Sequence, residues 1–384
     1  MESVLGGRLA IWTGPFHPDL ERGLHEYLES RQASIRKTHR LIPCAIVSPS
    51  EEIRRYLKCL ITLRWRMSLA GVHLLTVDSL ALRTVATVRD EQTIKRVDGL
   101  VLADLVRDIV LTKRFPDEWG DFLRFAGGAT AILRTLGDLE EARIPLAIEK
   151  GDPLLRLHRL YQVERKQLGL GTPTDTVEQA IQVASDSRFL QSLEEIVYYG
   201  FYDMTQVQLD MLARISTLCQ TSIFFPSVAD HRAYDFANGF LEELKVRFEE
   251  VEHPLAANLG AVEERPSASL RFAMNRLFSA GNADTASQIA KDSLRFFTAS
   301  GPEAELEITA KEILRWTEGG IDFSEIGIIA RNLEPYLPFL YSVFTAHAIP
   351  FRTPEALSIS RLPWVKALGT LNRIVVNEFS KTDV

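Results

Sequence analysis

The chain has 384 residues, of which 46% are hydrophobic and 25% charged, so it is long enough for two or three domains with separate cores. Its formal net charge of −7 argues against a general polyanion binder, although a local basic groove remains compatible with it. The three cysteines form no CxxC pair and the eight histidines lack metal-ligand spacing, which favours a reduced, cytoplasmic protein without a metal or other cofactor. No apolar run is long enough to span a membrane, and the N-terminus lacks a signal-peptide pattern.

The N-terminal segment predicts a buried strand at residues 9–13, a turn at Gly14 and a helix over residues 20–30. A phosphate-binding loop at this point needs several glycines, a lysine, and a serine or threonine for magnesium. The loop at residues 14–19 has one glycine, two prolines and no lysine. The pattern therefore favours a tight strand-to-helix turn over a nucleotide site.

Two further strand–helix pairs follow, with strands predicted at residues 41–47 and 72–77. Ser50 is placed to cap the helix that begins at Glu51. A basic cluster in this region suits either a solvated helix face or a contact with nucleic acid: Arg54, Arg55, Lys58, Arg64 and Arg66.

Residues 91–189 lack strand signals and contain long amphipathic runs, which predict a helical insertion. The sheet resumes with a strand at residues 196–199, a turn at Gly200, and a helix that opens near residues 203–205. A fifth strand is predicted at residues 221–225. Short apolar strands that alternate with helices indicate an α/β fold with a parallel sheet.

Residues 233–292 are expected to form a helical connector, and a second α/β segment is expected from residue 293. Its predicted strands are residues 294–298, residues 326–330 and a short one near Phe351. Because this second sheet looks unfinished at Val384, we expect the chain to come from a longer protein.

Two stretches carry a family resemblance: GFYDMTQVQLDML, and the run from FFTASGPEAELEITAKEILRWTEGGIDFSEIGIIARN to HAIPFR. The chain resembles superfamily 1 helicases, and more closely the inactivated helicase-like half of the AddB (RexB) subunit of bacterial helicase–nucleases. The resemblance implies a first RecA-like domain at residues 1–90 and 190–232, interrupted by the insertion at 91–189. It also implies a connector at 233–292 and the beginning of a second RecA-like domain at 293–384.

The resemblance also implies two sets of site residues. Tyr199 and Gly200 stand where active relatives have a magnesium-binding Asp and a catalytic Glu, so this chain is expected not to be an active ATPase. The full set of degenerate nucleotide-site remnants is Gly14, Tyr199, Gly200, Asp203, Gln208 and Arg331. The residues expected to approach DNA are Ser48, Ser50, Arg54, Arg55, Thr76 and Ser79.

Each set has a simpler structural alternative. Asp203 could start or cap a helix, Arg331 could pair with the acidic helix at residues 303–312, and Thr76 and Ser79 could be helix caps.

The function that the resemblance implies is non-catalytic: guiding a DNA single strand or duplex end and docking an AddA-type helicase–nuclease partner during double-strand break processing and recombinational repair. DNA binding is expected to be weak, and no membrane association is expected. Family members carry a nuclease domain, and some an iron–sulfur cluster, farther downstream than this sequence reaches. Two alternatives remain open, an ATP-driven helicase with divergent motifs and an interaction scaffold that binds no DNA.

Overall fold

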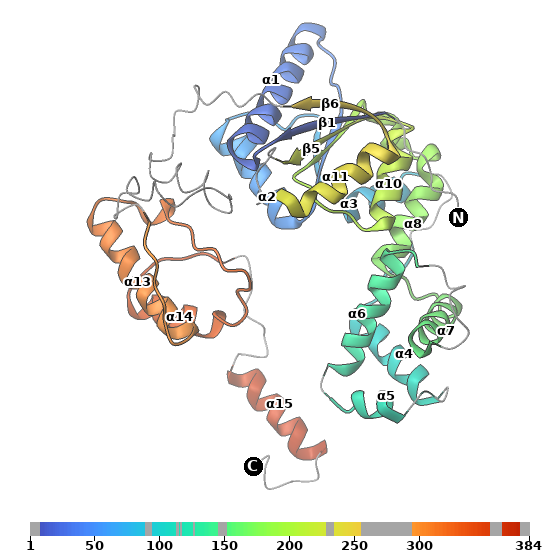
Figure 1. The fold of residues 1–384 in the computed structure, drawn as a ribbon, viewed down its shortest axis with the longest axis vertical. Coiled ribbons are helices and arrows are strands. Elements are labelled where there is room, and N and C mark those ends of the chain that lie inside the picture. Colours follow the sequence, from blue (N-terminus) through green and yellow to red (C-terminus); the bar gives the residue numbers. More distant parts are fainter. Residues whose placement is uncertain are drawn as a thin grey trace. The chain divides into compact units, whose positions relative to one another are not determined.

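The computed structural model describes residues 8–88, 94–112, 115, 117–125, 127–144, 152–227, 234–254, 294–353 and 363–376. The chain divides into two compact units, with the described residues up to 254 in the first and those from 294 onward in the second (Figure 1).

The first unit is built on a six-stranded sheet in which every adjacent pair of strands is parallel, in the order β3-β2-β4-β5-β1-β6. The predicted parallel α/β sheet is thus confirmed, and the strand expected at residues 196–199 lies in the same sheet as the N-terminal strand. The strands are β1 (Arg8–Gly14), β2 (Cys44–Ser48), β3 (Val72–Thr76), β4 (Glu195–Tyr199), β5 (Gln220–Pro226) and β6 (Glu249–Pro254).

Helices cover both faces of this sheet, because alternate residues of each buried strand point to opposite sides. In β4, Val197 and Tyr199 join the core formed with α1 (Glu21–Thr38) and α2 (Glu51–Cys59). Ile196 and Tyr198 join the core on the opposite face. The helices of that second face are α3 (Val77–Ala86), α8 (Pro173–Val183), α9 (Arg188–Ser192), α10 (Gln206–Ser216) and α11 (Asp235–Arg247).

The helical insertion has a hydrophobic core of its own, formed by α4 (Gly99–Thr112), α5 (Asp117–Phe122), α6 (Gly128–Glu141) and α7 (Pro153–Gln167). The segments by which the chain enters and leaves this insertion lie side by side, because the Gly171 amide donates to the Lys95 carbonyl at 3.0 Å. A Cβ at Gly171 would lie 2.2 Å from Cγ2 of Ile94, so only glycine allows this approach. The separate helical core therefore ends near residue 171, whereas the expected insertion reached 189, because α8 and α9 pack into the sheet core.

The connector prediction at residues 233–292 is wrong in its described part, because α11 is followed by the edge strand β6. The rest of that connector, residues 255–292, lies outside the described residues.

The second unit contains α13 (Pro302–Glu318), α14 (Leu337–Ala346) and α15 (Pro363–Val376), and the first two share a hydrophobic core. The three predicted strands of this unit are wrong, because residues 294–298, residues 326–330 and Phe351 form no strand. Phe296 and Ile329 are 88% and 98% exposed, so these segments leave apolar side chains uncovered that a sheet with packed helices would bury.

Candidate functional site at the carboxyl edge of the sheet

Ligands of open parallel α/β sheets bind where the strands end, because the loops and helix N-termini gather along that edge. In this chain the edge has two parts. The first, here called the β1/β4 edge, consists of Gly14, Phe16, Tyr199 and Gly200 with the loop that joins β1 to α1. The second, the β2/β3 edge, consists of Ser48, Ser50, Thr76 and Ser79. The two parts contain most of the predicted site residues.

The β1/β4 edge is closed by Phe16. Gly200 follows β4 with a φ of +78°, a left-handed conformation that favours glycine, and a Cβ added there would lie 2.9 Å from the Phe16 ring. The Gly200 amide donates to the Phe224 carbonyl at 3.0 Å, which fixes the turn beside β5. A glutamate at position 200 would therefore meet both an unfavourable backbone and an aromatic ring.

Tyr199 stands at the position for which the resemblance implies a magnesium ligand. In the structure it is a residue of the hydrophobic core. Its side chain is fully buried, and its ring contacts Phe16 edge-on with centroids 5.5 Å apart. Burial, followed by the nearby Glu21 carboxylate, raises the pKa of its hydroxyl, so Tyr199 is neutral at physiological pH. Within the described residues its hydroxyl has no hydrogen-bond partner. The residue contributes packing and supplies no ligand for a cation.

Two carboxylates lie at the start of the helix that follows β1. Asp19 is 4% exposed and accepts a hydrogen bond from Arg22 at 2.7 Å. Glu21 is 7% exposed, lies 3.0 Å from Nδ1 of His17, and accepts a hydrogen bond from Tyr56. A phosphate-binding helix N-terminus offers N–H groups to an anion. Here the start of the helix carries negative charge of its own, which opposes phosphate binding.

Asp203 and Gln208, two further residues of the predicted nucleotide-site set, lie just before and within the first turn of α10. Thr205 is the N-cap, and Gln208 completes a capping box by accepting from the Thr205 amide at 3.4 Å. Asp203 is exposed and precedes the cap, so it does not cap the helix as the simpler alternative supposed.

Arg331, the last residue of the predicted nucleotide-site set, belongs to the second unit. It is exposed and forms no ion pair with any residue that the structure describes. The alternative pairing with the acidic helix at residues 303–312 is therefore not seen. Glutamates of that helix pair with Arg295, Arg315 and His347 instead.

At the β2/β3 edge, the four predicted hydroxyls lie at the ends of two neighbouring strands and at the starts of the helices that follow them, and all four make hydrogen bonds within the chain. Ser48 is fully buried, and its hydroxyl shares its one hydrogen between the carbonyl oxygens of Ser50 and Leu75, which lie 3.1 and 3.2 Å away. Ser50 caps α2 by accepting from the Ile53 amide at 3.3 Å.

Thr76 and Ser79 form a reciprocal capping box at the start of α3. The Ser79 hydroxyl lies 2.7 Å from the Thr76 amide, and the Ser79 amide donates back to the Thr76 hydroxyl at 3.3 Å. The structural alternative for these two residues is therefore realised, and a contact with DNA remains a prediction.

Arg54 and Arg55 both lie against Glu51 on α2. Arg54 donates from Nε at 2.6 Å, and Arg55 lies 3.3 Å from the same carboxylate. The hydrogen bond from Arg54 is the largest influence on Glu51 and lowers its pKa to about 2. The Glu51 carboxylate partly neutralises both arginines, so the positive potential that they create at the edge is weaker than the sequence suggests.

An aromatic pair that the sequence analysis missed lies beyond the ends of β4 and β5. Tyr202 and Phe236 are 50% and 66% exposed, and their ring centroids are 5.3 Å apart in an edge-to-face arrangement. The sequence signal for this pair was position. Tyr202 closely follows the strand predicted at residues 196–199, and Phe236 lies near the start of the region predicted to be helical from residue 233. Exposed rings of this kind can stack on unpaired bases.

Within the described ranges, no group of three or more His, Cys, Asp or Glu side chains is arranged to hold a metal ion. None of the described helices combines the length and apolar character needed to cross a bilayer. Neither a scan against protein-family models nor a search of curated proteins finds a match to this chain.

Proposed function

We propose that this chain is a catalytically silent, RecA-like region of an AddB-type subunit, which guides DNA and docks a motor partner during the processing of DNA ends. The observation that carries the proposal is the closed β1/β4 edge. A parallel sheet with the strand–turn–helix plan of a nucleotide site is present, while Phe16 fills the space beside Gly200 and Tyr199 is buried.

The competing ATP-driven helicase is disfavoured by the same geometry. Phosphoryl transfer depends on positive charge around the β- and γ-phosphates, bound magnesium and a positioned nucleophile. The loop after β1 has no lysine, and two nearly buried carboxylates, Asp19 and Glu21, follow it. Divergent motifs cannot supply these functions through the residues that occupy the edge.

The DNA role is supported by two features of the carboxyl edge. Arg54 and Arg55 lie on α2, the helix that Ser50 caps, and the exposed Tyr202–Phe236 pair offers stacking surface. Stacking on an aromatic side chain contributes about 1–3 kcal/mol per base. Because Glu51 pairs with both arginines, binding should be weak and its salt dependence shallow, with a slope of about −0.7 per phosphate contacted.

The interaction-scaffold alternative is favoured by exposed apolar side chains of the helical insertion. Leu100, Leu111 and Phe125 are 73%, 63% and 68% exposed. Large apolar side chains left uncovered suit a protein partner, and this feature is shared by the docking role that we propose.

Fluorescence anisotropy with a labelled single-stranded oligonucleotide over a salt series tests the proposal. We expect weak binding by the wild type, a loss of affinity in Tyr202→Ala, and a shallower salt slope in the double variant Arg54→Gln, Arg55→Gln. A matched control, Arg36→Gln with Lys37→Gln, removes two exposed cations from the last turn of α1, at the opposite end of that helix from the edge, and should bind as the wild type does. No binding at low salt would leave the scaffold as the better account.

A further inference from the structure

The helical insertion meets the rest of the first unit across a polar junction. The hydrophobic core of the insertion and the sheet core that contains α8 and α10 are separate clusters of the described residues. Between them lies a cavity of about 540 Å³, lined by α6, α7 and the residues that follow α6 on one side and by α8 on the other. Because the two apolar clusters do not merge, polar contacts largely decide how the insertion is held.

One set of these contacts forms a neck where the chain enters and leaves the insertion. The Gly171 amide donates to the Lys95 carbonyl, and the Gly171 carbonyl accepts from the Val97 amide at 3.2 Å. Arg165 is 2% exposed and donates to both carboxylate oxygens of Asp175 in the first turn of α8. Backbone hydrogen bonds and a buried ion pair therefore fasten the neck.

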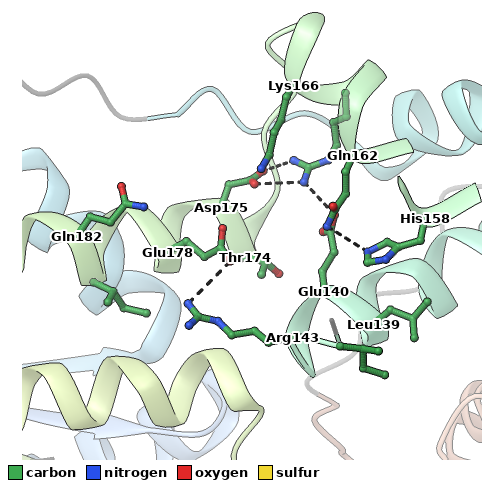
Figure 2. Close-up of a pocket in the computed structure, with 13 residues that line it drawn as sticks. Leu139, Glu140, Arg143, His158, Gln162, Lys166, Thr174, Asp175, Glu178 and Gln182 are labelled. Atoms are coloured by element: carbon green, nitrogen blue, oxygen red, sulfur yellow. Dashed lines mark hydrogen bonds and ion pairs between the residues drawn. The ribbon is translucent and has the colours of Figure 1, made fainter. Parts of the chain in front are cut away.

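A second contact is made by Arg143, which directly follows the end of α6. Its guanidinium pairs with Oδ2 of Asp210 on α10 and lies 3.9 Å from the carboxylate of Glu178 on α8, toward which it points in Figure 2. Its φ of +50° is a left-handed conformation that glycine usually supplies after a helix. The side chain lines the cavity and is 19% exposed, so Arg143 is the more accessible partner of the pair with Asp210.

Asp210 is arranged so that the loss of Arg143 leaves it paired. A buried ion pair is costly to break mainly when it leaves a charge without a partner. Asp210 is 5% exposed, and its two oxygens have different partners. Oδ2 takes Arg143 of the insertion, whereas Oδ1 takes Arg247 of α11 and accepts from the side-chain amide of Gln206 at 2.9 Å. The contact between the insertion and α10 can therefore open while the carboxylate keeps a guanidinium and an amide.

From this geometry we propose that Arg143 and Asp210 form a reversible latch between the insertion and the sheet core. In the latched state, Arg143 holds the insertion against α10. In the released state, the insertion turns about the neck at Gly171, and Asp210 stays paired with Arg247.

The latch sets the position in which the insertion presents its exposed apolar side chains, among them Leu100, Leu111 and Phe125. A partner that binds them in one of the two positions shifts the equilibrium toward that position. The latch itself follows from the contacts of Asp210 and does not depend on the proposed role in DNA processing.

Distance measurements by pulsed electron paramagnetic resonance on the full chain test the latch. One spin label is placed on the exposed Cys59 of α2 and the other on a cysteine that replaces the exposed Thr135 of α6, with Cys219→Ser to remove the half-buried thiol. We expect one main distance in this parent protein. Arg143→Gln should add a second distance and raise the ratio of released to latched molecules by at least about tenfold, as expected for the loss of one charge-assisted hydrogen bond.

The matched control is Arg247→Gln, which removes the other guanidinium from the same carboxylate. Because Arg247 and Asp210 both belong to the sheet core, this variant should lower the urea midpoint of unfolding without adding a second distance. Arg143→Gln should keep a midpoint near that of the parent. Should Arg247→Gln not fold, Arg124→Gln replaces it, because Arg124 is an exposed arginine of the insertion that pairs with Asp121 and should leave the distance unchanged.

The latch is supported if the second distance is present in Arg143→Gln and absent from the control. The proposal is overturned if Arg143→Gln keeps the distance distribution of the parent, whether or not its midpoint falls, because the ion pair would then be a fixed structural contact. It is equally overturned if the control variant shows the same second distance.

Discussion

The two parts of the carboxyl edge differ in what occupies them. At the β1/β4 edge, the positions of the implied magnesium ligand and catalytic Glu are occupied by Tyr199 and Gly200, and Phe16 packs over both. At the β2/β3 edge, the polar residues are present, but Ser50, Thr76 and Ser79 hold the first turns of α2 and α3. The first part is therefore hydrophobic core, and the second is polar.

This difference predicts different tolerance to substitution. A polar residue introduced into the β1/β4 edge must lose its water, whereas a capping hydroxyl removed from the β2/β3 edge leaves a helix N–H group that water can reach. Introducing a charged group at the β1/β4 edge should thus destabilise the first unit much more than removing a hydroxyl from the β2/β3 edge.

The largest effect is expected for Tyr199→Asp, which places a carboxylate in the core against Phe16 and Phe224. A buried charge without a partner destabilises by about 3–5 kcal/mol. The matched control Tyr199→Phe removes only a hydroxyl that has no partner in the described residues, so it should lie within about 1 kcal/mol of wild type. Urea unfolding of the wild type, Tyr199→Asp and Tyr199→Phe measures both changes in the free energy of unfolding. Equal stability of the Asp and Phe variants would show that the site is open to water.

A smaller loss is expected for Gly200→Ala, because the added Cβ meets the Phe16 ring in a left-handed backbone conformation. Strain of this type costs about 1–3 kcal/mol. When Phe16 is already alanine, the clash is absent, and Gly200→Ala adds only the backbone strain to the loss caused by Phe16→Ala. A double-mutant cycle should therefore show coupling between the two positions, and strictly additive losses would argue that Phe16 does not cover Gly200.

At the β2/β3 edge, Ser50→Ala and Thr76→Ala should each destabilise the first unit by about 1 kcal/mol through loss of an N-cap. Chemical denaturation of each variant, with Ser50→Asp as a replacement that can still cap, provides the measurement. A loss restored by aspartate identifies capping as the role of Ser50. A loss of DNA affinity in Ser50→Ala without a loss of stability would instead assign Ser50 to DNA.

The smallest effect concerns the charge on α2. Because the hydrogen bond from Arg54 lowers the pKa of Glu51 to about 2, this carboxylate stays ionised well below the pH at which an ordinary glutamate titrates. The favourable pairing is complete above about pH 4.3 and declines as pH falls toward the lowered pKa. An NMR titration of the Glu51 carboxyl should show this low midpoint, and Arg54→Gln should move it back toward the usual range. An ordinary midpoint in the wild type would mean that Arg54 is free to meet phosphate.

Much of the first unit follows from sequence patterns. The apolar runs that became β1, β2, β3, β4 and β5 have strong β character, and Ser50 caps α2 as its position before Glu51 predicts. The strand β6 was missed because its sequence, EEVEHP, is acidic. It is an edge strand with β1 as its partner, so its place depends on tertiary pairing and not on its own propensity.

Residues 294–298 and 326–330 illustrate the opposite error. Both are apolar and β-branched or aromatic, which is the usual strand signature, yet neither has a strand partner among the described residues. A segment forms a strand only where a neighbouring strand pairs with it, and the composition of one segment does not show whether such a partner is present.

The closure of the β1/β4 edge could be predicted only in part. The missing lysine and the missing carboxylates were visible in the sequence. The contact that fills the space joins Phe16 to Gly200, and no local pattern links residues so far apart in the chain. The acidic residues Asp19 and Glu21 were visible at the start of a predicted helix, but their burial, and the contact of Glu21 with Tyr56, depend on how α2 packs against α1.

The most direct test of the account is isothermal titration calorimetry of the wild-type chain with ATP in the presence of magnesium. Phe16 closes the edge, Tyr199 supplies no magnesium ligand, and the start of the following helix bears Asp19 and Glu21. The account therefore predicts no saturable heat up to millimolar nucleotide. A micromolar Kd for MgATP would contradict the account, because it would require an open phosphate site at the strand ends.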